Sequence, residues 1–333
     1  MTSLPVLELR AAFGDRLLEN VSLGHYTSAR LGGMADVVLT AKSSDDLRMM
    51  AAYLSHRDIP FVILGGGSNV LVSDAGVRGV VVLNRARKVR FDEKSSPPTV
   101  WAESGANLGR VARLAAARGL AGLEWASGIP GTVGGAVFGN AGAHGSDLSN
   151  NLKMAEILHL NRMTGEVSAG NITYQSREEP DMEFPIEKWS MEQCGFEYRS
   201  SSFKRQHLRA VILAAQLNLE WSTPRAAQAK IKEYTTYRRL TQPPGASMGS
   251  MFKNPPGDFA GRMIEEVGLK GTRLGDAQIS PVHGNFFINQ GNATAADVYA
   301  LIDLARRKVY DKTGIQLELE IELFGEWEIE RTG

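Results

Sequence analysis

The sequence has a single cysteine, Cys194, no surplus charge of either sign and no long apolar run. One cysteine excludes an intramolecular disulfide and fits a reducing compartment. Lysine plus arginine and aspartate plus glutamate number 37 each, so no overall field attracts nucleic acid or an acidic membrane. No stretch approaches the roughly 20 apolar residues that span a bilayer, and the first ten residues are unlike a signal peptide. We therefore expect a cytoplasmic protein with no nucleic-acid partner and no membrane insertion.

Familiar site motifs are also absent. Neither G-x-G-x-x-G nor G-x-x-x-x-G-K-[ST] occurs, which argues against an ordinary Rossmann site and against a P-loop. The six histidines show neither H-x-H nor H-E-x-x-H spacing, so we expect no metal site.

The first third of the chain predicts alternating strands and helices. Apolar, β-rich runs at residues 35–39, 61–64 and 80–83 are typical of buried strands. Ser43 and Asn107 offer N-caps for two helices, each with one apolar face. A chain of 333 residues exceeds one ordinary core, so we expect two or three lobes.

The rest of the chain is less regular. Residues 161–170 predict a hairpin turn, 177–188 an acidic surface excursion, and 210–219 an apolar strand. Residues 315–323 alternate apolar and polar side chains, which predicts a strand with one buried face. Alternation alone does not choose among the three carboxylates on the other face, Glu318, Glu320 and Glu322.

Two further helices carry clear start and stop signals. Thr223 and Pro224 are typical of the first positions of a helix, which we expect to end at about Leu240. The segment from Thr294 resembles a capping box and opens an amphipathic helix that Gly314 closes.

Two glycine-rich loops are candidates for a dinucleotide site. They are Gly65-Gly66-Gly67-Ser68-Asn69 and Gly128-Ile129-Pro130-Gly131-Thr132-Val133-Gly134-Gly135. A backbone without Cβ atoms can approach a pyrophosphate closely, and successive N–H groups can form an anion nest. Either loop alone is compatible with a tight turn or close packing. Together they favour a dinucleotide, and the N-terminal half of the chain is typical of a flavin-binding region.

Two polar segments and one carboxylate are candidates for chemistry. Ser250 lies within residues 247–255 and Arg199 within 196–204, each among turn-forming and aromatic residues. A hydroxyl, a guanidinium and a carboxylate at one site could add a proton to a carbanion beside a carboxylate. Taken alone, however, Ser250 is better explained as a turn residue and Arg199 as a surface cation.

Six segments, in this order, resemble the signatures of the UDP-N-acetylenolpyruvoylglucosamine reductases. They are Tyr26–Gly33, Gly65–Asp74, Gly128–Ala136, Tyr198–Lys204, Gly249–Pro255 and Gly314–Ile321. Six signatures in order are far more specific than any one, and the last singles out Glu320. The short span from Phe203 to Ala210 is similar to the family's second type, which lacks a tyrosine-bearing insertion. Residues 177–188 and Met251 depart from the family pattern.

The resemblance implies a multi-lobed chain of mixed α/β and α+β class. A flavin-binding domain of the vanillyl-alcohol-oxidase type would occupy two lobes, residues 1–85 and 86–221. A C-terminal α+β domain, residues 222–313, would bind substrate, and residues 314–333 would bring Glu320 to the active site.

The same resemblance implies the reaction. NADPH would reduce non-covalently bound FAD at N5 and leave, and UDP-N-acetylglucosamine enolpyruvate would then occupy the same site. Hydride would reach C3 of the enolpyruvyl group while Ser250 protonates C2 and Arg199 stabilises the developing enolate. Glu320 would orient Arg199 or polarise the substrate. The product would be UDP-N-acetylmuramate, a precursor of peptidoglycan, and the sequence leaves the oligomeric state open, a monomer included.

The remaining site residues follow from the resemblance. Expected flavin contacts come from Tyr26, Thr27, Gly65, Gly66, Gly67, Ser68, Asn69, Gly128, Ile129, Thr132, Gly134, Gly135 and Arg238. Expected substrate contacts come from Asn254, Lys270 and Asn285. Each has a structural alternative, because a helix-surface arginine, an exposed lysine before a turn and turn-forming asparagines are all common.

Two other functions stay open at this point. A flavin oxidoreductase of the same cofactor-binding type could oxidise an alcohol or a sugar, but it would need no proton donor to C2. A non-catalytic nucleotide-binding protein could have kept the loops alone. Bleaching by NADPH and recolouring by the enolpyruvyl substrate would separate the three.

Overall fold

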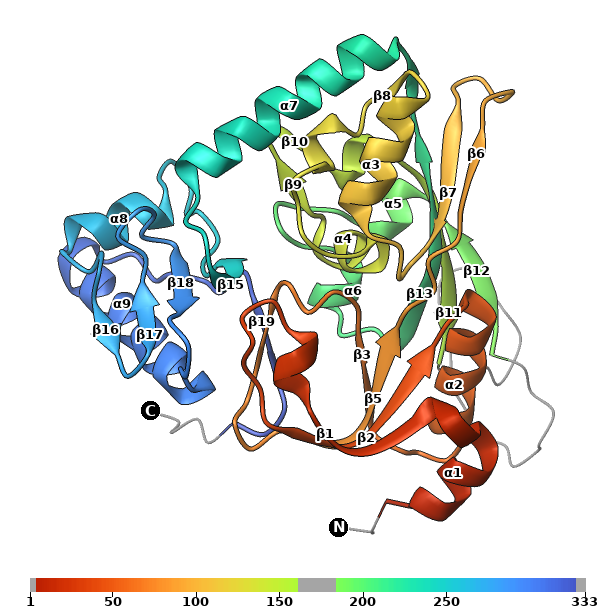
Figure 1. Cartoon of the computed structure of the whole chain (residues 1–333), viewed down its shortest axis with the longest axis horizontal. Helices are drawn as coiled ribbons and strands as arrows, with labels where there is room; N and C mark the ends of the chain where they lie inside the picture. Colours follow the sequence, from red (N-terminus) through yellow and green to blue (C-terminus); the bar gives the residue numbers. More distant parts are fainter. Residues whose placement is uncertain (1–3, 161–183, 328–333) are drawn as a thin grey trace. The chain divides into compact units, whose positions relative to one another are not determined.

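The structure, a computed structural model, describes residues 4–160 and 184–327 (Figure 1). The chain forms two compact units, each assembled from separate stretches of sequence. Unit 1 contains residues 1–40, 61–83 and 232–333, and unit 2 contains residues 41–60 and 84–231. Within the described ranges, no helix has the length and apolar character needed to cross a membrane.

The N-terminal part of unit 1 is built on a four-stranded sheet that follows the short helix α1 (Val6–Phe13). The strand order is β1-β2-β5-β3, and β3 pairs with β5 in parallel. Its strands are β1 (Leu17–Ser22), β2 (Met34–Ala41), β3 (Phe61–Leu64) and β5 (Val77–Asn84). The predicted strands at 35–39, 61–64 and 80–83 are therefore confirmed, and apolar side chains from all three belong to one buried core.

The C-terminal part of unit 1 has a second sheet and two helices around one apolar core. The rings of Phe252 and Phe287, both fully buried, meet edge to face with centroids 6.1 Å apart. The sheet has the order β15-β18-β17-β16. The elements are β15 (Ala246–Ser250), α8 (Ala260–Glu266), β16 (Arg273–Leu274), β17 (Ala277–Ile279), β18 (Phe286–Asn289) and α9 (Ala295–Thr313).

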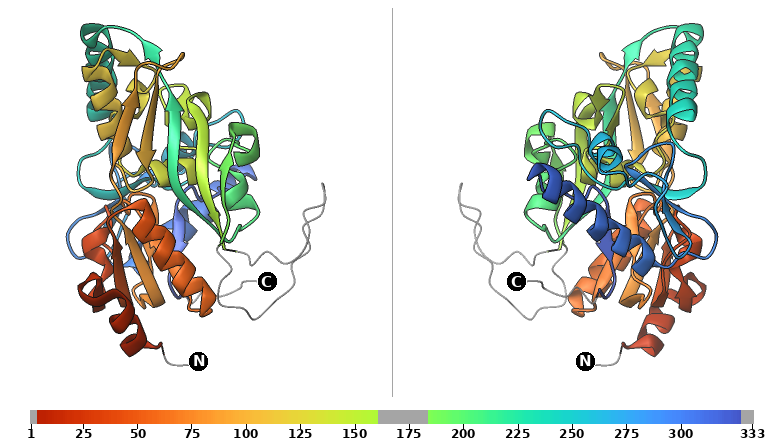
Figure 2. Two further views of the ribbon diagram at one scale, coloured as in Figure 1. Left: turned by 90° about the vertical axis from the view of Figure 1, so that its right-hand side faces the viewer. Right: turned by 90° about the vertical axis from the view of Figure 1, so that its left-hand side faces the viewer.

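Unit 2 is built on a five-stranded antiparallel sheet of order β12-β11-β13-β7-β6. The long strands β11 and β13 run side by side in Figure 2. The strands are β6 (Val89–Asp92), β7 (Thr99–Glu103), β11 (Leu152–His159), β12 (Ile186–Trp189) and β13 (Ala210–Asn218). Two small strand pairs are β8 (Leu120–Ala121) with β14 (Glu220–Trp221) and β9 (Gly142–Ala143) with β10 (Ser146–Asp147). The helices are α2 (Ser44–His56), α3 (Leu108–Ala117), α4 (Val133–Gly139), α5 (Met191–Cys194) and α6 (Ser202–Arg205), and α7 (Pro224–Thr241) runs from this unit into unit 1.

The predicted helix starts are confirmed by their caps. The side chains of Ser43 and Asn107 accept hydrogen bonds from the N–H groups of Asp46 (3.1 Å) and Arg110 (2.8 Å). Thr294 forms the predicted capping box, and Gly314 ends α9 in the left-handed conformation. The sequence predicted these helix starts because each capping side chain bonds to a residue of its own helix.

The single strand predicted over residues 315–323 is wrong in extent. Only β19 (Glu322–Phe324) is a strand, and it pairs in parallel with β4 (Val70–Val72). The predicted alternation is right, since Leu317 and Ile321 are buried while Glu318 is exposed. Before Glu322 the chain runs beside the irregular segment 251–253, which offers one bridge and no continuous ladder.

The predicted hairpin at 161–170 lies outside the described residues. The predicted surface excursion at 177–188 is wrong at its end, because residues 186–188 belong to β12 and pair with β11. Glu187 and Lys188 are exposed on this edge strand. Charged residues of this kind are also typical of a surface loop, which is why the sequence did not predict the strand. Cys194 is wholly buried, and burial raises the pKa of its thiol to about 12.

Candidate active site

The first glycine-rich loop follows β3 in unit 1 and packs against residues 26–28. Gly67 has a φ of 62°, and a Cβ atom at this position would lie 2.1 Å from the carbonyl oxygen of Tyr26. The Ser28 N–H donates to the Gly67 carbonyl oxygen at 2.9 Å. Only glycine fits here, so the structure brings together two sequence segments that were predicted to hold the same ligand.

Two N–H groups of this loop are available to a ligand. Among the described residues, neither the Gly66 nor the Gly67 N–H has a hydrogen-bond acceptor. Successive unbonded N–H groups suit an anion such as a diphosphate. Thr27 behaves differently, because it is buried and its hydroxyl is bonded to both the N–H and the carbonyl oxygen of Leu31.

The same loop is tied to the segment that carries Glu320. The Asn69 side-chain amide donates to the Glu320 carbonyl oxygen at 3.0 Å, and the Glu322 N–H donates to the Asn69 carbonyl oxygen at 2.9 Å. The pairing of β19 with β4 continues this connection. The loop and the predicted catalytic carboxylate are thus held by a shared set of backbone bonds.

Ser250 lies at the end of β15, immediately beside that segment. The Glu320 N–H donates to the carbonyl oxygen of Met251 at 2.9 Å. The backbone of Glu320 therefore lies beside the residue that follows Ser250. Ser250 is half-buried, and its hydroxyl makes no hydrogen bond within the described ranges. Its oxygen is therefore not committed to a turn or a cap.

Asn285 fixes the segment that carries Ser250. Its side-chain oxygen accepts from the Phe252 N–H at 2.9 Å, and its side-chain nitrogen donates to the Phe252 carbonyl oxygen at 2.8 Å. The residue is 2% exposed. Both ends of the amide are thus occupied by the backbone two residues after Ser250, which is the geometry of a positioning residue.

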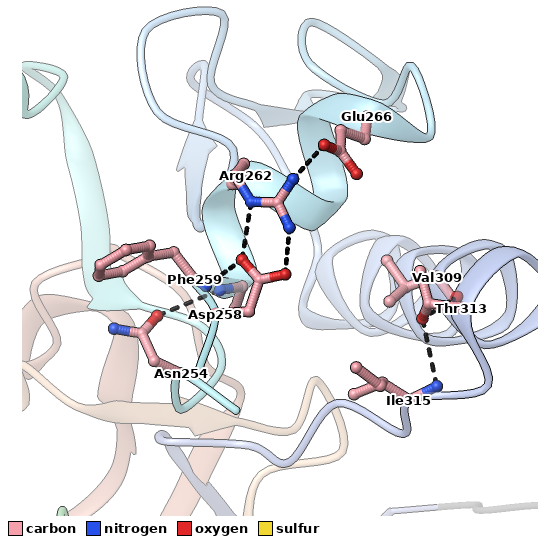
Figure 3. Close-up of polar contacts among 9 residues, drawn as sticks. Asn254, Asp258, Phe259, Arg262, Glu266, Val309, Thr313 and Ile315 are labelled. Carbon is pink, nitrogen blue, oxygen red and sulfur yellow. Dashed lines mark hydrogen bonds and ion pairs between the residues drawn. The ribbon is translucent and has the colours of Figure 1, made fainter. Parts of the chain in front are cut away.

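The other predicted substrate residues already have protein partners. The Asn254 side-chain oxygen accepts from the Ala260 N–H at 3.1 Å, at the start of α8 (Figure 3). Next to it, Arg262 pairs with Asp258 and Glu266. The Lys270 ammonium lies 3.1 Å from a carboxylate oxygen of Glu265.

Arg238 is a half-buried cation in the last turn of α7. Burial lowers the pKa of its guanidinium. In the part of the chain that the structure describes, this guanidinium has no hydrogen bond or ion pair. A half-buried arginine without an anionic partner is suited to an anionic ligand.

The second glycine-rich loop is held by the helices of unit 2. Asn107 and the Leu108 N–H both donate to the Gly131 carbonyl oxygen, each at 3.2 Å. The Gly134 N–H donates to the Ser104 carbonyl oxygen at 2.8 Å, and a Cβ atom on Gly134 would lie 2.8 Å from the Ser104 Cβ. The N–H groups of Gly128 and Gly131 have no acceptor among the described residues.

Thr132 and Gly135 continue this loop into α4. The Thr132 hydroxyl accepts from the Gly135 N–H at 3.3 Å and so caps the helix. The Ile129 N–H is bonded to the Ala126 carbonyl oxygen at 3.0 Å. The loop therefore has a fixed course, and the N–H groups of Gly128 and Gly131 are among those without an acceptor in the described residues.

Arg199 is held in unit 2 by the chain that follows the second loop. Its backbone has a φ of 53°, a region that costs a non-glycine residue energy and that concentrates at functional sites. One guanidinium nitrogen donates to the Gly142 carbonyl oxygen at 2.7 Å, and the guanidinium lies 5.3 Å from the ring centroid of Tyr198. Its orientation is thus set before any ligand binds.

Two residues that the sequence did not single out support Arg199. Asn140, which is 2% exposed, donates from its side chain to the Glu197 carbonyl oxygen at 3.0 Å. The Ser201 hydroxyl donates to the Phe138 carbonyl oxygen at 2.6 Å. Asn140 lies in the left-handed conformation directly after α4, and its place in Gly-Asn-Ala-Gly was the only signal that could have revealed it.

Comparison with known families assigns both parts of the chain. The FAD binding domain model matches residues 35–167, and the C-terminal domain model of UDP-N-acetylenolpyruvoylglucosamine reductase matches residues 240–324. The reductase of Chloroflexus aggregans is 38% identical over 308 residues, covering 92% of this chain and 96% of the relative. The reductase of Rubrobacter xylanophilus is 40% identical and covers 91% of this chain and 94% of the relative.

The chain belongs to the UDP-N-acetylenolpyruvoylglucosamine reductase family.

A solved member of this reductase family has the same fold. The crystal structure of the Thermus caldophilus enzyme superposes with a TM-score of 0.72 at 34% identity, covering 92% of this chain and 98% of that one. The predicted family, the mixed α/β fold class and the assignment to FAD-dependent oxidoreductases are confirmed. No group of three or more metal-ligating side chains is found in the residues that the structure describes.

Proposed function

We propose that this chain reduces UDP-N-acetylglucosamine enolpyruvate to UDP-N-acetylmuramate with NADPH and bound FAD, in the cytoplasm, as a step of peptidoglycan precursor synthesis. One observation carries the proposal. The first glycine-rich loop, the Glu320 segment and the Ser250 segment are joined in unit 1 by hydrogen bonds of 2.9–3.0 Å. An oxidase of the same cofactor type would have no use for a hydroxyl donor beside a flavin-binding loop.

The residues present fit FAD. The free N–H groups of Gly66 and Gly67 suit the pyrophosphate, and a Cβ atom at Gly67 or Gly134 would fill space that the close-packed backbone leaves to glycine alone. Arg238 supplies a half-buried cation. We assign Tyr26, Ser68, Gly128 and the neighbouring loop residues to the same ligand. When bound, FAD supplies the hydride chemistry, accepting hydride from NADPH and delivering it to C3 of the enolpyruvyl group.

Ser250 supplies the proton. Hydride addition at C3 places an electron pair on C2, next to the substrate carboxylate, and C2 then takes a proton from the Ser250 hydroxyl. A serine hydroxyl is a weak acid, but a C2 carbanion is strongly basic and the proton moves only a short way. The hydroxyl is uncommitted within the described residues, as a proton donor must be.

Arg199 and Glu320 stabilise charge and geometry. The guanidinium stays cationic and can bind the carboxylate oxygens of the substrate in a fork while negative charge develops on them. Because its side chain is already bound to the Gly142 carbonyl oxygen, little reorientation is needed. Glu320 orients Arg199 or polarises the enolpyruvyl group, and its backbone is fixed by Met251 and Asn69.

We assign the nucleotide-sugar to the C-terminal part, residues 222–313, with residues 314–333 supplying Glu320 and residues 1–85 and 86–221 forming the two flavin-binding lobes. Lys270 and Asn254 are the proposed contacts to the diphosphate and the sugar. Lys270 is paired with the exposed Glu265, which a phosphate can replace. For Asn285, the two hydrogen bonds to the Phe252 backbone favour a role in positioning Ser250 over a direct contact with substrate.

The test is anaerobic stopped-flow absorbance at the oxidised-flavin band. NADPH is added first and UDP-N-acetylglucosamine enolpyruvate second. Bleaching followed by rapid recovery of colour is expected. Bleaching without recovery would assign the chain another acceptor, and a purified protein that takes up no FAD would contradict the proposal altogether.

A further inference from the structure

A cationic cavity in unit 2 is not used by the proposed reaction. Its volume is about 370 Å³, and it lies between the start of α2 and the strands β6 and β7. Five cations line it: Lys42, Arg85, Arg87, Lys88 and Arg90. None of its lining residues belongs to the two glycine-rich loops or to the segments of Arg199, Ser250 and Glu320. Five of the 37 lysine and arginine residues thus line one concave site.

The two acidic residues that line the cavity, Glu103 and Asp45, form no ion pair with Lys42, Arg87 or Lys88 within the described residues. Glu103 is 4% exposed, and its carboxylate accepts from the Ser44 N–H (2.9 Å), the Ser44 hydroxyl (3.1 Å) and the Lys88 N–H (2.7 Å). It therefore holds the two walls together through the backbone. Asp45 is exposed in the first turn of α2. Within the described part of the chain, the side chains of Lys42, Arg87 and Lys88 form no ion pair.

One wall of the cavity is aromatic and rigid. The Arg90 guanidinium lies 5.2 Å from the ring centroid of Trp101, and the Trp101 indole N–H donates to Glu156 at 3.1 Å. Clustered guanidinium and ammonium groups around a concave, partly apolar surface of this size bind small phosphorylated molecules. A flat or convex surface would instead fit an extended polyanion such as nucleic acid or a membrane.

We propose that this cavity binds a small molecule carrying a di- or triphosphate group. Arg87, Lys88 and Lys42 contact the phosphate oxygens, and Arg90 and Trp101 form the wall against which the rest of the molecule lies. The Glu103 bridge keeps the cations in place in the absence of ligand. The inference is independent of the proposed reaction, since it uses none of the same residues.

The test is isothermal titration calorimetry of the FAD-loaded protein with inorganic tripolyphosphate. Loading with FAD keeps tripolyphosphate out of the proposed cofactor site. Calorimetry measures binding and does not depend on activity. Saturable binding with a Kd below about 1 mM is expected. In the double variant Arg87→Gln/Lys88→Gln we expect the Kd to rise about tenfold or more, because charge-assisted contacts are lost at two positions.

The matched control is Arg209→Gln/Lys153→Gln, which removes the same charge from exposed positions of unit 2 outside the cavity. Its Kd should stay within about twofold of the parent. The proposal would be overturned if tripolyphosphate did not bind, or if both double variants lost the same affinity. It would also be overturned if a short DNA duplex or anionic lipid vesicles bound more tightly than tripolyphosphate. Titration with ATP and UDP, each repeated in Arg87→Gln/Lys88→Gln, then identifies the source, since only a nucleotide that binds in the cavity loses affinity in that variant.

Discussion

Each unit of this protein joins one glycine-rich loop to one candidate catalytic residue, but the two units hold that residue differently. In unit 2 the Arg199 side chain is itself bonded, to the Gly142 carbonyl oxygen, and its backbone is held in the left-handed region. In unit 1 the backbone around Ser250 is fixed by Asn285 and Glu320, while the Ser250 hydroxyl has no hydrogen bond to any residue that the structure describes.

The difference matches the chemistry proposed for the two residues. A group that stabilises charge gains from a fixed orientation, because no reorganisation is then needed during the reaction. A proton donor must be able to turn its hydrogen toward the acceptor, so only its carbon framework is fixed. The following predictions test this comparison, from the largest expected effect to the smallest.

Gly67→Ala should remove flavin binding and destabilise unit 1. The new Cβ atom would meet the Tyr26 carbonyl oxygen at 2.1 Å, with an unfavourable φ in addition. We expect a cost on the order of 3 kcal/mol or more. Absorbance of the purified protein and thermal unfolding measure both effects.

In the second loop, Gly135→Ala has no such clash, since the nearest atom lies 3.5 Å away. It should keep the melting temperature and lose only flavin affinity. A flavin-free and destabilised Gly135→Ala would show that this position of the second loop does not tolerate an added methyl group either.

Ser250→Ala should leave flavin reduction by NADPH unchanged and slow flavin reoxidation by the enolpyruvyl substrate about a hundredfold or more. The proton donor acts only in the second half-reaction. Stopped-flow absorbance separates the two, and Ser247→Ala on the same strand is the control. Equal slowing of both half-reactions would remove Ser250 from the role of proton donor.

Asn285→Ala should destabilise unit 1 by about 2–4 kcal/mol, because the Phe252 N–H and carbonyl oxygen lose the buried side chain that bonds to both of them. Urea unfolding measures this change, with the exposed Asn292→Ala as the control. If unfolding is unaffected while the KM for the nucleotide-sugar rises, Asn285 contacts substrate directly.

Arg199→Lys should slow reoxidation by about tenfold, since lysine keeps the charge but loses the fork that binds both Gly142 and an enolate. Flavin reduction by NADPH should be unaffected. Arg205→Lys, which changes an exposed arginine of the same segment, is the control. Full activity of Arg199→Lys would mean that charge alone is sufficient and that the fixed orientation is not used.

The smallest effect concerns His283, whose Nδ1 accepts from the Asn285 N–H at 3.2 Å. Burial, and then Lys270, lower the pKa of His283 below 6.5. Stability from the neutral imidazole is therefore complete above about pH 6.5 and is lost as the pH falls through the folded-state pKa.

We expect the free energy of unfolding to fall between pH 7 and 5, and His283→Gln should reduce this fall. Urea unfolding at several pH values measures the slope, and the exposed His207→Gln is the control. A slope that is unchanged in His283→Gln would assign the acid sensitivity to other groups.

Much of the fold was predictable because its signals are local. The strand Phe61–Leu64 has the predicted bounds, and the caps at Ser43, Asn107 and Thr294 lie where they were predicted. Such features depend on residues within a few positions of one another. The prediction of the terminal strand was wrong because it depended on a distant partner. The segment beside residues 315–321 is irregular and does not form a continuous ladder with them.

The candidate site was predictable only as a set of residues. The sequence motifs selected Arg199, Ser250 and Glu320, and their proposed roles rest on the family resemblance. Nothing in the motifs indicated that Asn140 and Ser201 anchor the arginine segment, because their hydrogen-bond partners lie about 60 positions away.

The sequence by itself determined the glycine-rich loops, the helix ends and the alternating buried face before β19. Only the tertiary structure decided that the Asn69 side-chain amide donates to the Glu320 carbonyl oxygen, 251 positions away, and that the Asn285 side chain bonds to the Phe252 backbone. Buried or constrained backbone groups must find hydrogen-bond partners, and in these irregular segments the partners come from distant parts of the chain. Residue type sets which partners are chemically possible, and the packing of the whole chain selects the one that is used.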